Sequence, residues 1–251
     1  QHYVDPSINA NSGTGTIGDP FGDLQYALNT VTRDSTNGDQ FNIKSGTAEV
    51  LTAELSFASY GTTTASAPAV FAGYTSAAND GGIGVIDGNA GGFRFAYNVY
   101  TVWKDLELRN SGNSPILIGN AAYTIAINCT FHGATSSSSS NAAAWRMRCY
   151  GCNFYDCING AFESDCFGCG FFDGSNRNFN RAIYFGYMLV GNVIYTAGVG
   201  ISGHNSGAGL IANNSIFMTS SNYGISISGS QNGKQIVDNL VEGQYGISAL
   251  T

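Results

Sequence analysis

The stretch Cys149-Tyr-Gly-Cys-Asn-Phe154 returns 17 residues later as Cys166-Phe-Gly-Cys-Gly-Phe171, and this pair belongs to a longer series. Each copy has an apolar residue at the first and last positions and Gly, Asn or Asp at the third. The other copies are Trp103-Lys-Asp-Leu-Glu-Leu108, Ala126-Ile-Asn-Cys-Thr-Phe131, Leu189-Val-Gly-Asn-Val-Ile194, Ile211-Ala-Asn-Asn-Ser-Ile216 and Ile236-Val-Asp-Asn-Leu-Val241. Successive copies start 23, 23, 17, 23, 22 and 25 residues apart, which defines a repeat of about 22 residues.

The third position of the repeat predicts a backbone bend. Gly, Asn and Asp are the residue types that adopt the left-handed conformation with the least strain. The seven bend residues are Asp105, Asn128, Gly151, Gly168, Gly191, Asn213 and Asp238. We therefore expect each copy to form two short strands joined by a one-residue bend.

The neighbouring positions predict which side chains face the core. Side chains alternate between the two faces of a strand, so the uniformly apolar first and last positions should both point inward. The fourth position should also point inward and stack as a ladder, in which buried Asn amides bond to one another and to backbone groups. The ladder residues are Cys129, Cys152, Cys169, Asn192, Asn214 and Asn239.

A strand, a bend, a second strand and a return loop, repeated with like residues stacking, describe one coil of a parallel β-solenoid. Later apolar stretches such as 182–185, 200–202, 224–227 and 246–248 supply a third side, so we expect three faces. The fold class expected is therefore all-β.

The first hundred residues follow the repeat less closely. Strand-like stretches at 40–44, 53–57, 69–72 and 84–87 predict irregular early coils. The apolar spacing in Phe21–Val31 predicts a short helix, starting near Asp19-Pro20, that caps the open first coil. We expect one domain over 1–251, made of an N-terminal strand and capping helix (1–38), irregular coils (39–100) and regular coils (101–251).

The N-terminal segment carries a family resemblance in Tyr3-Val-Asp-Pro6, Asp19-Pro-Phe21, Leu24-Gln-Tyr-Ala-Leu28 and Gly38-Asp-Gln-Phe-Asn-Ile43. With the coils, it resembles the right-handed parallel β-helix proteins of the pectate-lyase-like superfamily, which includes phage tailspikes. The resemblance implies a right-handed solenoid over nearly the whole chain. It says less about function, because that superfamily holds lyases, hydrolases, adhesins and virion proteins.

Charge and composition limit the partners. The chain has 17 acidic and 10 basic residues, a net charge of -7 and a pI near 4.7, which argues against nucleic acid as a partner. Its apolar runs are far shorter than the roughly 18 residues of a membrane span. Few charges and much Gly, Asn and Ser favour an extracellular or virion location.

Four cysteines match a zinc-site spacing, but the repeat offers another explanation. Cys149 and Cys166 share one inward column, and Cys152 and Cys169 share another, so stacked coils alone produce the spacing. Free Cys packs as a small core residue. We expect core thiols first, stacked disulfides second and zinc last, and hence no metal or other cofactor.

One charged patch could carry catalysis. Its candidate residues are Asp156, Glu163, Asp165, Asp173 and Arg148. The resemblance implies clustered Asp residues that bind calcium beside an Arg base, as in pectate lyases, so calcium belongs only to a lyase function. The competing explanation is structural, because Arg148 and Asp165 share a column on adjacent coils and would form a cross-strand ion pair.

An outward column predicts an interaction surface. It holds His132, Tyr155, Phe172, Tyr195 and Phe217, and a second outward column before the bend adds Ile127, Tyr150, Phe167, Val190 and Val237. Monomers rarely expose so much apolar area. In order of preference, we expect the aromatic column to be a subunit interface, a face covered by return loops such as 134–144, or a sugar-binding platform.

The favoured function is therefore a non-enzymatic structural protein of the extracellular space or a virion, such as a phage tail or capsid spike, that self-associates or binds other structural subunits. The alternatives are a polysaccharide lyase or glycoside hydrolase, and a noncatalytic glycan-binding adhesin, both with a polysaccharide as partner.

Overall fold

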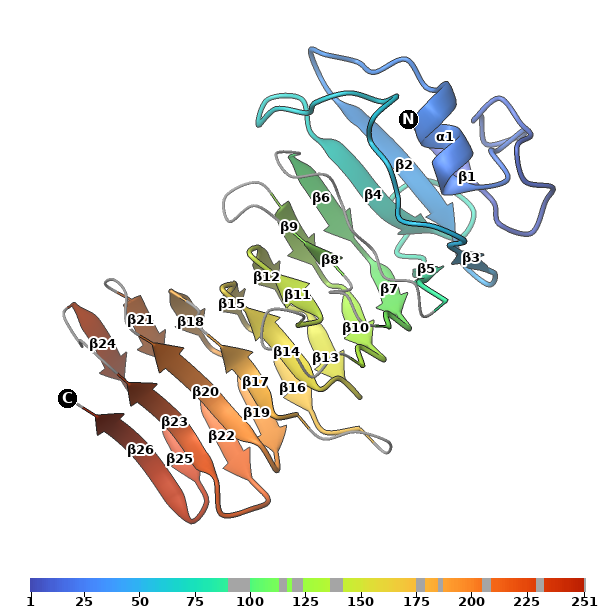
Figure 1. Ribbon diagram of the computed structural model, residues 1–251. Helices are drawn as coiled ribbons and strands as arrows, with labels where there is room; N and C mark the ends of the chain where they lie inside the picture. The colour runs from blue at the N-terminus through green and yellow to red at the C-terminus, as the bar shows by residue number, and fades with distance from the viewer. Residues whose placement is uncertain are drawn as a thin grey trace.

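The computed structural model describes residues 1–89, 100–112, 117–118, 124–135, 142–174, 179–184, 187–204, 209–228 and 233–250. Within these ranges 26 strands form three sheets, and the strand pairings within each sheet are parallel. From β6 onward the chain passes through the first, second and third sheets in turn, and we call each such circuit a coil. The two termini lie at opposite ends of the stack (Figure 1). The architecture is mostly β and consistent with a parallel β-solenoid.

The strands of each sheet follow in spatial order. The first sheet holds β1 (His2–Val4), β2 (Asp39–Lys44), β4 (Ala69–Tyr74), β6 (Thr101–Lys104), β9 (Thr124–Ile127), β12 (Arg148–Tyr150), β15 (Asp165–Phe167), β18 (Met188–Val190), β21 (Gly209–Ala212) and β24 (Lys234–Val237). The second holds β3 (Ala48–Val50), β5 (Gly84–Asp87), β7 (Leu106–Arg109), β10 (Thr130–His132), β13 (Asn153–Tyr155), β16 (Gly170–Phe172), β19 (Val193–Thr196), β22 (Ser215–Met218) and β25 (Leu240–Glu242). The third holds β8 (Leu117–Ile118), β11 (Ala144–Trp145), β14 (Asn159–Phe162), β17 (Arg181–Tyr184), β20 (Val199–His204), β23 (Tyr223–Ser228) and β26 (Tyr245–Leu250).

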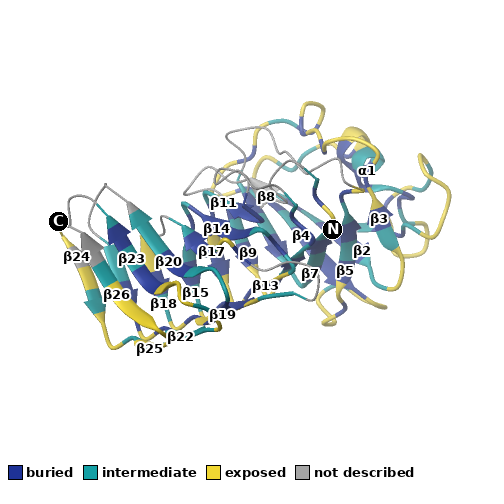
Figure 2. Cartoon of the chain, turned by 60° about the horizontal axis from the view of Figure 1, so that its bottom comes forward, coloured by how far each residue is buried: buried dark blue, intermediate teal, exposed yellow. Residues whose placement is uncertain are grey.

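The core is built from stacked like residues. Phe154 lies opposite Phe131 on one side and Phe171 on the other, with ring centroids 4.8 and 4.6 Å away and interplanar angles of 6° and 2°. Along the first sheet, Cys149 lies opposite Cys166 in the same way, and both are fully buried. Exposed residues gather on β25 and β26 at the C-terminal end, because these strands have a neighbour on one side alone (Figure 2).

The expected bends between the first and second sheets are present. All seven residues have φ between 51° and 68°, in the left-handed region. The other corners use the same conformation less regularly, with Asn110, Gly133 and Asp156 at φ 58°, 72° and 52° after the second sheet. Arg146 and Glu163 adopt it after the third sheet. The six-residue motif that marks each repeat does not include these corners, so the sequence did not predict the left-handed residues there.

The fourth column forms the expected ladder. The side chain of Asn192 donates to Oδ1 of Asn214 over 2.8 Å and to the carbonyl of Cys166 over 2.9 Å. The side chain of Asn214 donates to Asn239 and Leu189 in the same manner. Cys129, Cys152 and Cys169 occupy the equivalent inward positions and are buried.

The helix forms, but it begins later than expected. Helix α1 covers Leu24–Thr30, and Asp23 is its N-cap, accepting a hydrogen bond from the backbone N–H of Tyr26. Asp19 instead belongs to a turn, where its carbonyl accepts from Thr14 and Gly15. Leu24, Ala27 and Leu28 bury the apolar face that the spacing predicted.

The prediction of a strand at 53–57 is wrong. Leu55 and Phe57 are buried, which explains the apolar alternation, but the segment is not part of a sheet. The backbone N–H and carbonyl of Ser56 bond to the side chain of Gln25 instead of a neighbouring strand. The short strand of this region is β3, earlier in the chain.

Candidate interaction surface

The outer face of the second sheet carries the column of aromatic residues that the repeat predicted. Adjacent strands place His132, Tyr155, Phe172, Tyr195 and Phe217 opposite one another in a single row, which we call the outer aromatic column. Its central members remain open to solvent, with 37% of Tyr155, 40% of Phe172 and 51% of Tyr195 exposed. Such a row of half-exposed rings on a flat sheet is a candidate binding surface.

The rings at the start of this column are stacked on one another. The centroids of His132 and Tyr155 lie 4.6 Å apart with an interplanar angle of 7°. The two ring surfaces that face each other are therefore occupied. Gly170 belongs to the same face because a side chain there would lie 2.4 Å from the ring of Phe172.

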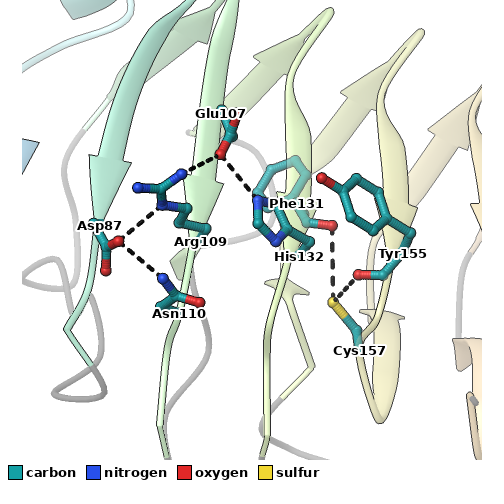
Figure 3. Close-up of polar contacts among 8 residues, drawn as sticks. All are labelled: Asp87, Glu107, Arg109, Asn110, Phe131, His132, Tyr155 and Cys157. Carbon is teal, nitrogen blue, oxygen red and sulfur yellow. Dashed lines mark hydrogen bonds and ion pairs between the residues drawn. The ribbon is translucent and has the colours of Figure 1, made fainter. Parts of the chain in front are cut away.

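A cluster of polar side chains continues the column toward the N-terminus (Figure 3). Arg109 lies opposite His132, and its guanidinium contacts Asp87 at 2.8 Å and Glu107 at 3.0 Å. Glu107 also lies 3.0 Å from Nε2 of His132, while the amide of Asn110 donates to Asp87 over 2.8 Å. We call these five residues the polar cluster.

Electrostatics keep the polar cluster charged. Burial opposes ionisation of Asp87 and Glu107, but hydrogen bonds from Arg109 and neighbouring groups outweigh it and lower both pKa values. The same contacts raise the pKa of Arg109. Two carboxylates and one guanidinium are thus held together at this end of the column.

The polar cluster was missed at the sequence level, although the repeat contained the signal for part of it. Arg109 follows Leu108 as His132 follows Phe131, so extending the outward column by one copy reaches it. Asp87 lies one coil earlier, in the irregular region where the six-residue pattern has no copy. Only the pairing of β5 with β7 in the folded chain shows that Asp87 lies beside Arg109.

A second exposed column lies on the outer face of the first sheet. It consists of Ile127, Tyr150, Phe167, Val190, Ala212 and Val237, which we call the first-sheet apolar column. The rings of Tyr150 and Phe167 stack at 4.9 Å and 9°. Ile127 and Tyr150 are each 37% exposed and Val237 is 45% exposed, whereas Ala212 is buried.

The candidate catalytic residues divide between two corners of the solenoid. Glu163 lies between the third and first sheets and Asp165 begins β15 of the first sheet, whereas Asp156 and Asp173 follow strands of the second sheet. Arg148 and Asp165 are opposite one another and 3.8 Å apart, and Glu163 pairs with Arg146.

The carboxylates of Asp165 and Asp173 accept hydrogen bonds from backbone N–H groups. Asp165 accepts a hydrogen bond from the N–H of Met188, and Asp173 accepts from the N–H groups of Phe179 and Ala197 and from Thr196. The structure does not gather the four carboxylates into one site.

The six cysteines are free and buried in the core. Hydrogen bonds among neighbouring thiols act in both directions, and together with burial their net effect raises the pKa of Cys149, Cys152 and Cys166 well above the usual range. The same causes raise the pKa of Cys169 to about 12. Within the described part of the chain, no three His, Cys, Asp or Glu side chains are grouped as metal ligands.

Comparison with protein-family models finds no match to this chain, and comparison with curated proteins finds no significant relative. Among the described residues, no helix combines the length and apolar character needed to cross a membrane.

Proposed function

We propose that the chain is a non-catalytic structural protein of the extracellular space or a virion that self-associates through the outer aromatic column. It would be a right-handed parallel β-helix of the pectate-lyase-like superfamily, with α1 capping the first coil. The observation that carries the proposal is the solvent exposure of Tyr155, Phe172 and Tyr195 in one row. Tyr and Phe are enriched at protein interfaces, where their rings bury large areas at low entropic cost.

Ring orientation favours a protein partner over a sugar. Stacking on a pyranose requires a free ring face, but the facing surfaces of His132 and Tyr155 cover each other. These two ring surfaces are thus closed to a sugar, and the imidazole is held by Glu107. A protein surface can pack against the exposed rings of Tyr155, Phe172 and Tyr195 without a free ring face at every position.

Cover by the chain's own loops receives less support. The central rings of the column are 37% to 51% exposed. The return segment considered for this role, 134–144, falls partly outside the described residues, at 136–141.

Light scattering after size-exclusion chromatography tests the proposal. We expect the natural chain to form oligomers and Tyr195→Glu to shift it toward monomer, because a carboxylate would be buried in the interface. The matched control is Tyr223→Glu, since Tyr223 is 42% exposed but lies on the third sheet. A natural chain that stays monomeric at the highest soluble concentration contradicts self-association.

A glycan-binding adhesin is the second candidate, and one observation favours it. A cavity of about 360 Å³ lies where β5, β7 and β10 end, beside the polar cluster, and is lined by Asp87, Asn89, Asn110, Ser111, Gly112, Gly133 and Thr135. Amide, hydroxyl and carboxylate groups are the donors and acceptors that polyols use. Titration calorimetry against neutral and acidic oligosaccharides tests it, with Asn110→Ala expected to abolish any heat of binding.

A further inference from the structure

We propose that a cavity at the N-terminal end of the solenoid binds a small organic ammonium ion, whose charged group pairs with the carboxylate of Glu49. The cavity has a volume of about 320 Å³ and is lined by residues of the N-terminal loop, α1, β3 and the segment after β3. Both α1 and β3 lie at the end of the stack where the chain begins (Figure 1). The site is separate from the outer aromatic column, so the inference does not depend on the proposed self-association.

Glu49 occupies a position at which later coils carry apolar side chains. It lies opposite Ile86 on β5, and Ile86 lies opposite Leu108 on β7, both of which are buried in the core. Only 4% of Glu49 is exposed. A buried carboxyl is costly unless it is hydrogen-bonded and, when ionised, paired with a positive charge. Its presence in an apolar column beside a cavity makes Glu49 a candidate binding group.

Helix α1 uses one oxygen of this carboxyl. The backbone N–H of Leu24 donates to Oε1 of Glu49 over 3.1 Å. From the described residues, Oε2 accepts no hydrogen bond. The amide oxygen of a Gln would accept the bond from Leu24 as well as a carboxylate does. The contact with α1 therefore explains neither the second oxygen nor the charge, and Oε2 remains available to a donor that enters the cavity.

The charged side chains that line the cavity are all acidic. Asp23 and Glu54 line it together with Glu49, whereas its described lining contains no Lys, Arg or His. Both side-chain oxygens of Asp23 are already occupied, by the backbone N–H groups of Tyr26 and Asn11. Burial and the Asp23 charge together raise the pKa of Glu49 against the opposing hydrogen bond. A cation in the cavity would favour the ionised form of Glu49, and an anion would be repelled.

The rest of the lining suits a carbon skeleton. Leu51 and Leu55 are buried at its wall, and Val50 and Tyr26 also line it. Small-molecule sites typically combine apolar walls with a few polar groups that fix orientation. An ammonium group has three donors and can use a single carboxylate oxygen, whereas Ca²⁺ takes six to eight oxygen ligands. The lining therefore favours an organic cation over a metal ion.

Benzylammonium is a suitable probe, because it joins one ammonium group to a compact apolar ring. Benzyl alcohol and benzoate are its neutral and anionic counterparts of nearly the same shape. Titration calorimetry on the full chain at pH 8 compares the three. We expect benzylammonium to bind at least about tenfold more tightly than either counterpart.

The affinity should follow the ionisation of Glu49. With a pKa of about 7, this carboxyl is roughly one-tenth ionised at pH 6 and nine-tenths ionised at pH 8. Benzylammonium stays charged over this range, so its apparent affinity should rise about tenfold from pH 6 to pH 8. At pH 7 binding should release about half a proton per ligand. Calorimetry in two buffers of different ionisation enthalpy measures that release.

Glu49→Gln keeps an acceptor for Leu24 but removes the carboxylate. We expect it to lose at least about tenfold in affinity for benzylammonium, together with the pH dependence. The matched control is Glu242→Gln, which removes one exposed carboxylate from β25 at the other end of the solenoid and should change neither. If circular dichroism shows that Glu49→Gln does not fold, the proton release by the natural chain decides.

Three outcomes overturn the inference. The first is no heat of binding with about 20 mM benzylammonium at pH 8. The second is equal affinity for benzyl alcohol, which would show a site that selects apolar rings and not charge. The third is unchanged affinity in Glu49→Gln, or binding by the natural chain without proton release, which would place the amine elsewhere. None of these results bears on self-association, which light scattering tests separately.

Discussion

Asn192 donates two hydrogen bonds to the same side-chain oxygen of Asn214, one from its backbone N–H over 3.0 Å and one from its amide over 2.8 Å. Asn214 likewise donates two hydrogen bonds to Oδ1 of Asn239, from its backbone N–H over 3.0 Å and from its amide over 2.8 Å. Asn192 and Asn214 are fully buried. The ladder therefore links three successive coils through amides that are shielded from water at Asn192 and Asn214 and half-buried at Asn239.

We predict that Asn214→Ala destabilises the protein by about 3 kcal/mol or more. The substitution leaves the N–H groups of Asn192 and the carbonyl of Leu189 without their side-chain partner, and each unsatisfied buried group costs about 1–3 kcal/mol. Urea unfolding followed by circular dichroism measures the loss. The control is Asn153→Ala on the exposed face of β13, and equal losses for the two variants would contradict a stabilising ladder.

The bends lead to a prediction about Gly151. Its φ is 59°, and no atom lies within 4 Å of the position that a side chain would occupy, so conformation rather than space limits substitution. We expect Gly151→Ala to cost about 1–2 kcal/mol, Gly151→Asn to cost less and Gly151→Val to cost more. Thermal unfolding of the three variants gives the order of destabilisation. The prediction is contradicted if Gly151→Asn is the least stable of the three.

Glu49 predicts a dependence of stability on pH. Burial raises the pKa of Glu49 to about 7 from an ordinary 4.5, the Asp23 charge acts in the same direction, and a hydrogen bond from the N–H of Leu24 opposes them. The folded protein thus holds this proton more tightly than the unfolded chain. The contribution of this proton to the free energy of unfolding is complete below about pH 4.5. It is lost as the pH rises through 7, a change on the order of 3 kcal/mol.

Glu49→Gln tests this dependence, because Gln keeps the acceptor for Leu24 but carries no charge. We expect the variant to match the natural protein at pH 4.5 and to be more stable at pH 8, as measured by scanning calorimetry. Glu54→Gln, at an exposed position in the segment after β3, is the control. A variant less stable than the natural protein at pH 8 would show that Glu49 is not held protonated by burial.

The cysteines should be unreactive in the native state. All six are buried and free, and four have a raised pKa, so few thiolates are available for alkylation. We expect iodoacetamide to label none of them within minutes in buffer and all six in guanidinium chloride, as counted by mass spectrometry. Fewer than six labels after denaturation without reductant would indicate stacked disulfides, and a retained zinc ion would indicate the metal site.

Local rules predicted much of the solenoid. Asp105 and Asn128 bend the chain because their side chains tolerate positive φ, a property of single residues that needs no tertiary context. Phe131, Phe154 and Phe171 face inward because strand geometry alternates side chains with period two. These features repeat in the sequence because they repeat in space.

The errors arose where a side chain replaced a strand as hydrogen-bond partner. Gln25, on helix α1, bonds to the backbone of Ser56, so the segment around Leu55 is buried without joining a sheet. Likewise Asp23 rather than Asp19 caps the helix, because Asp19 takes part in a turn with Thr14 and Gly15. Competition between alternative partners depends on three-dimensional proximity, which short patterns do not contain.

By itself the sequence determined the repeat, the bends between the first and second sheets, the inward columns and the outer aromatic column. Each depends on the conformation of one residue or on alternation along one strand. Only the tertiary structure decided that Asp87, Glu107, Arg109 and His132 form one cluster and that the catalytic candidates divide between two corners. Those relationships depend on which strands lie side by side, and strand pairing is a property of the whole folded chain.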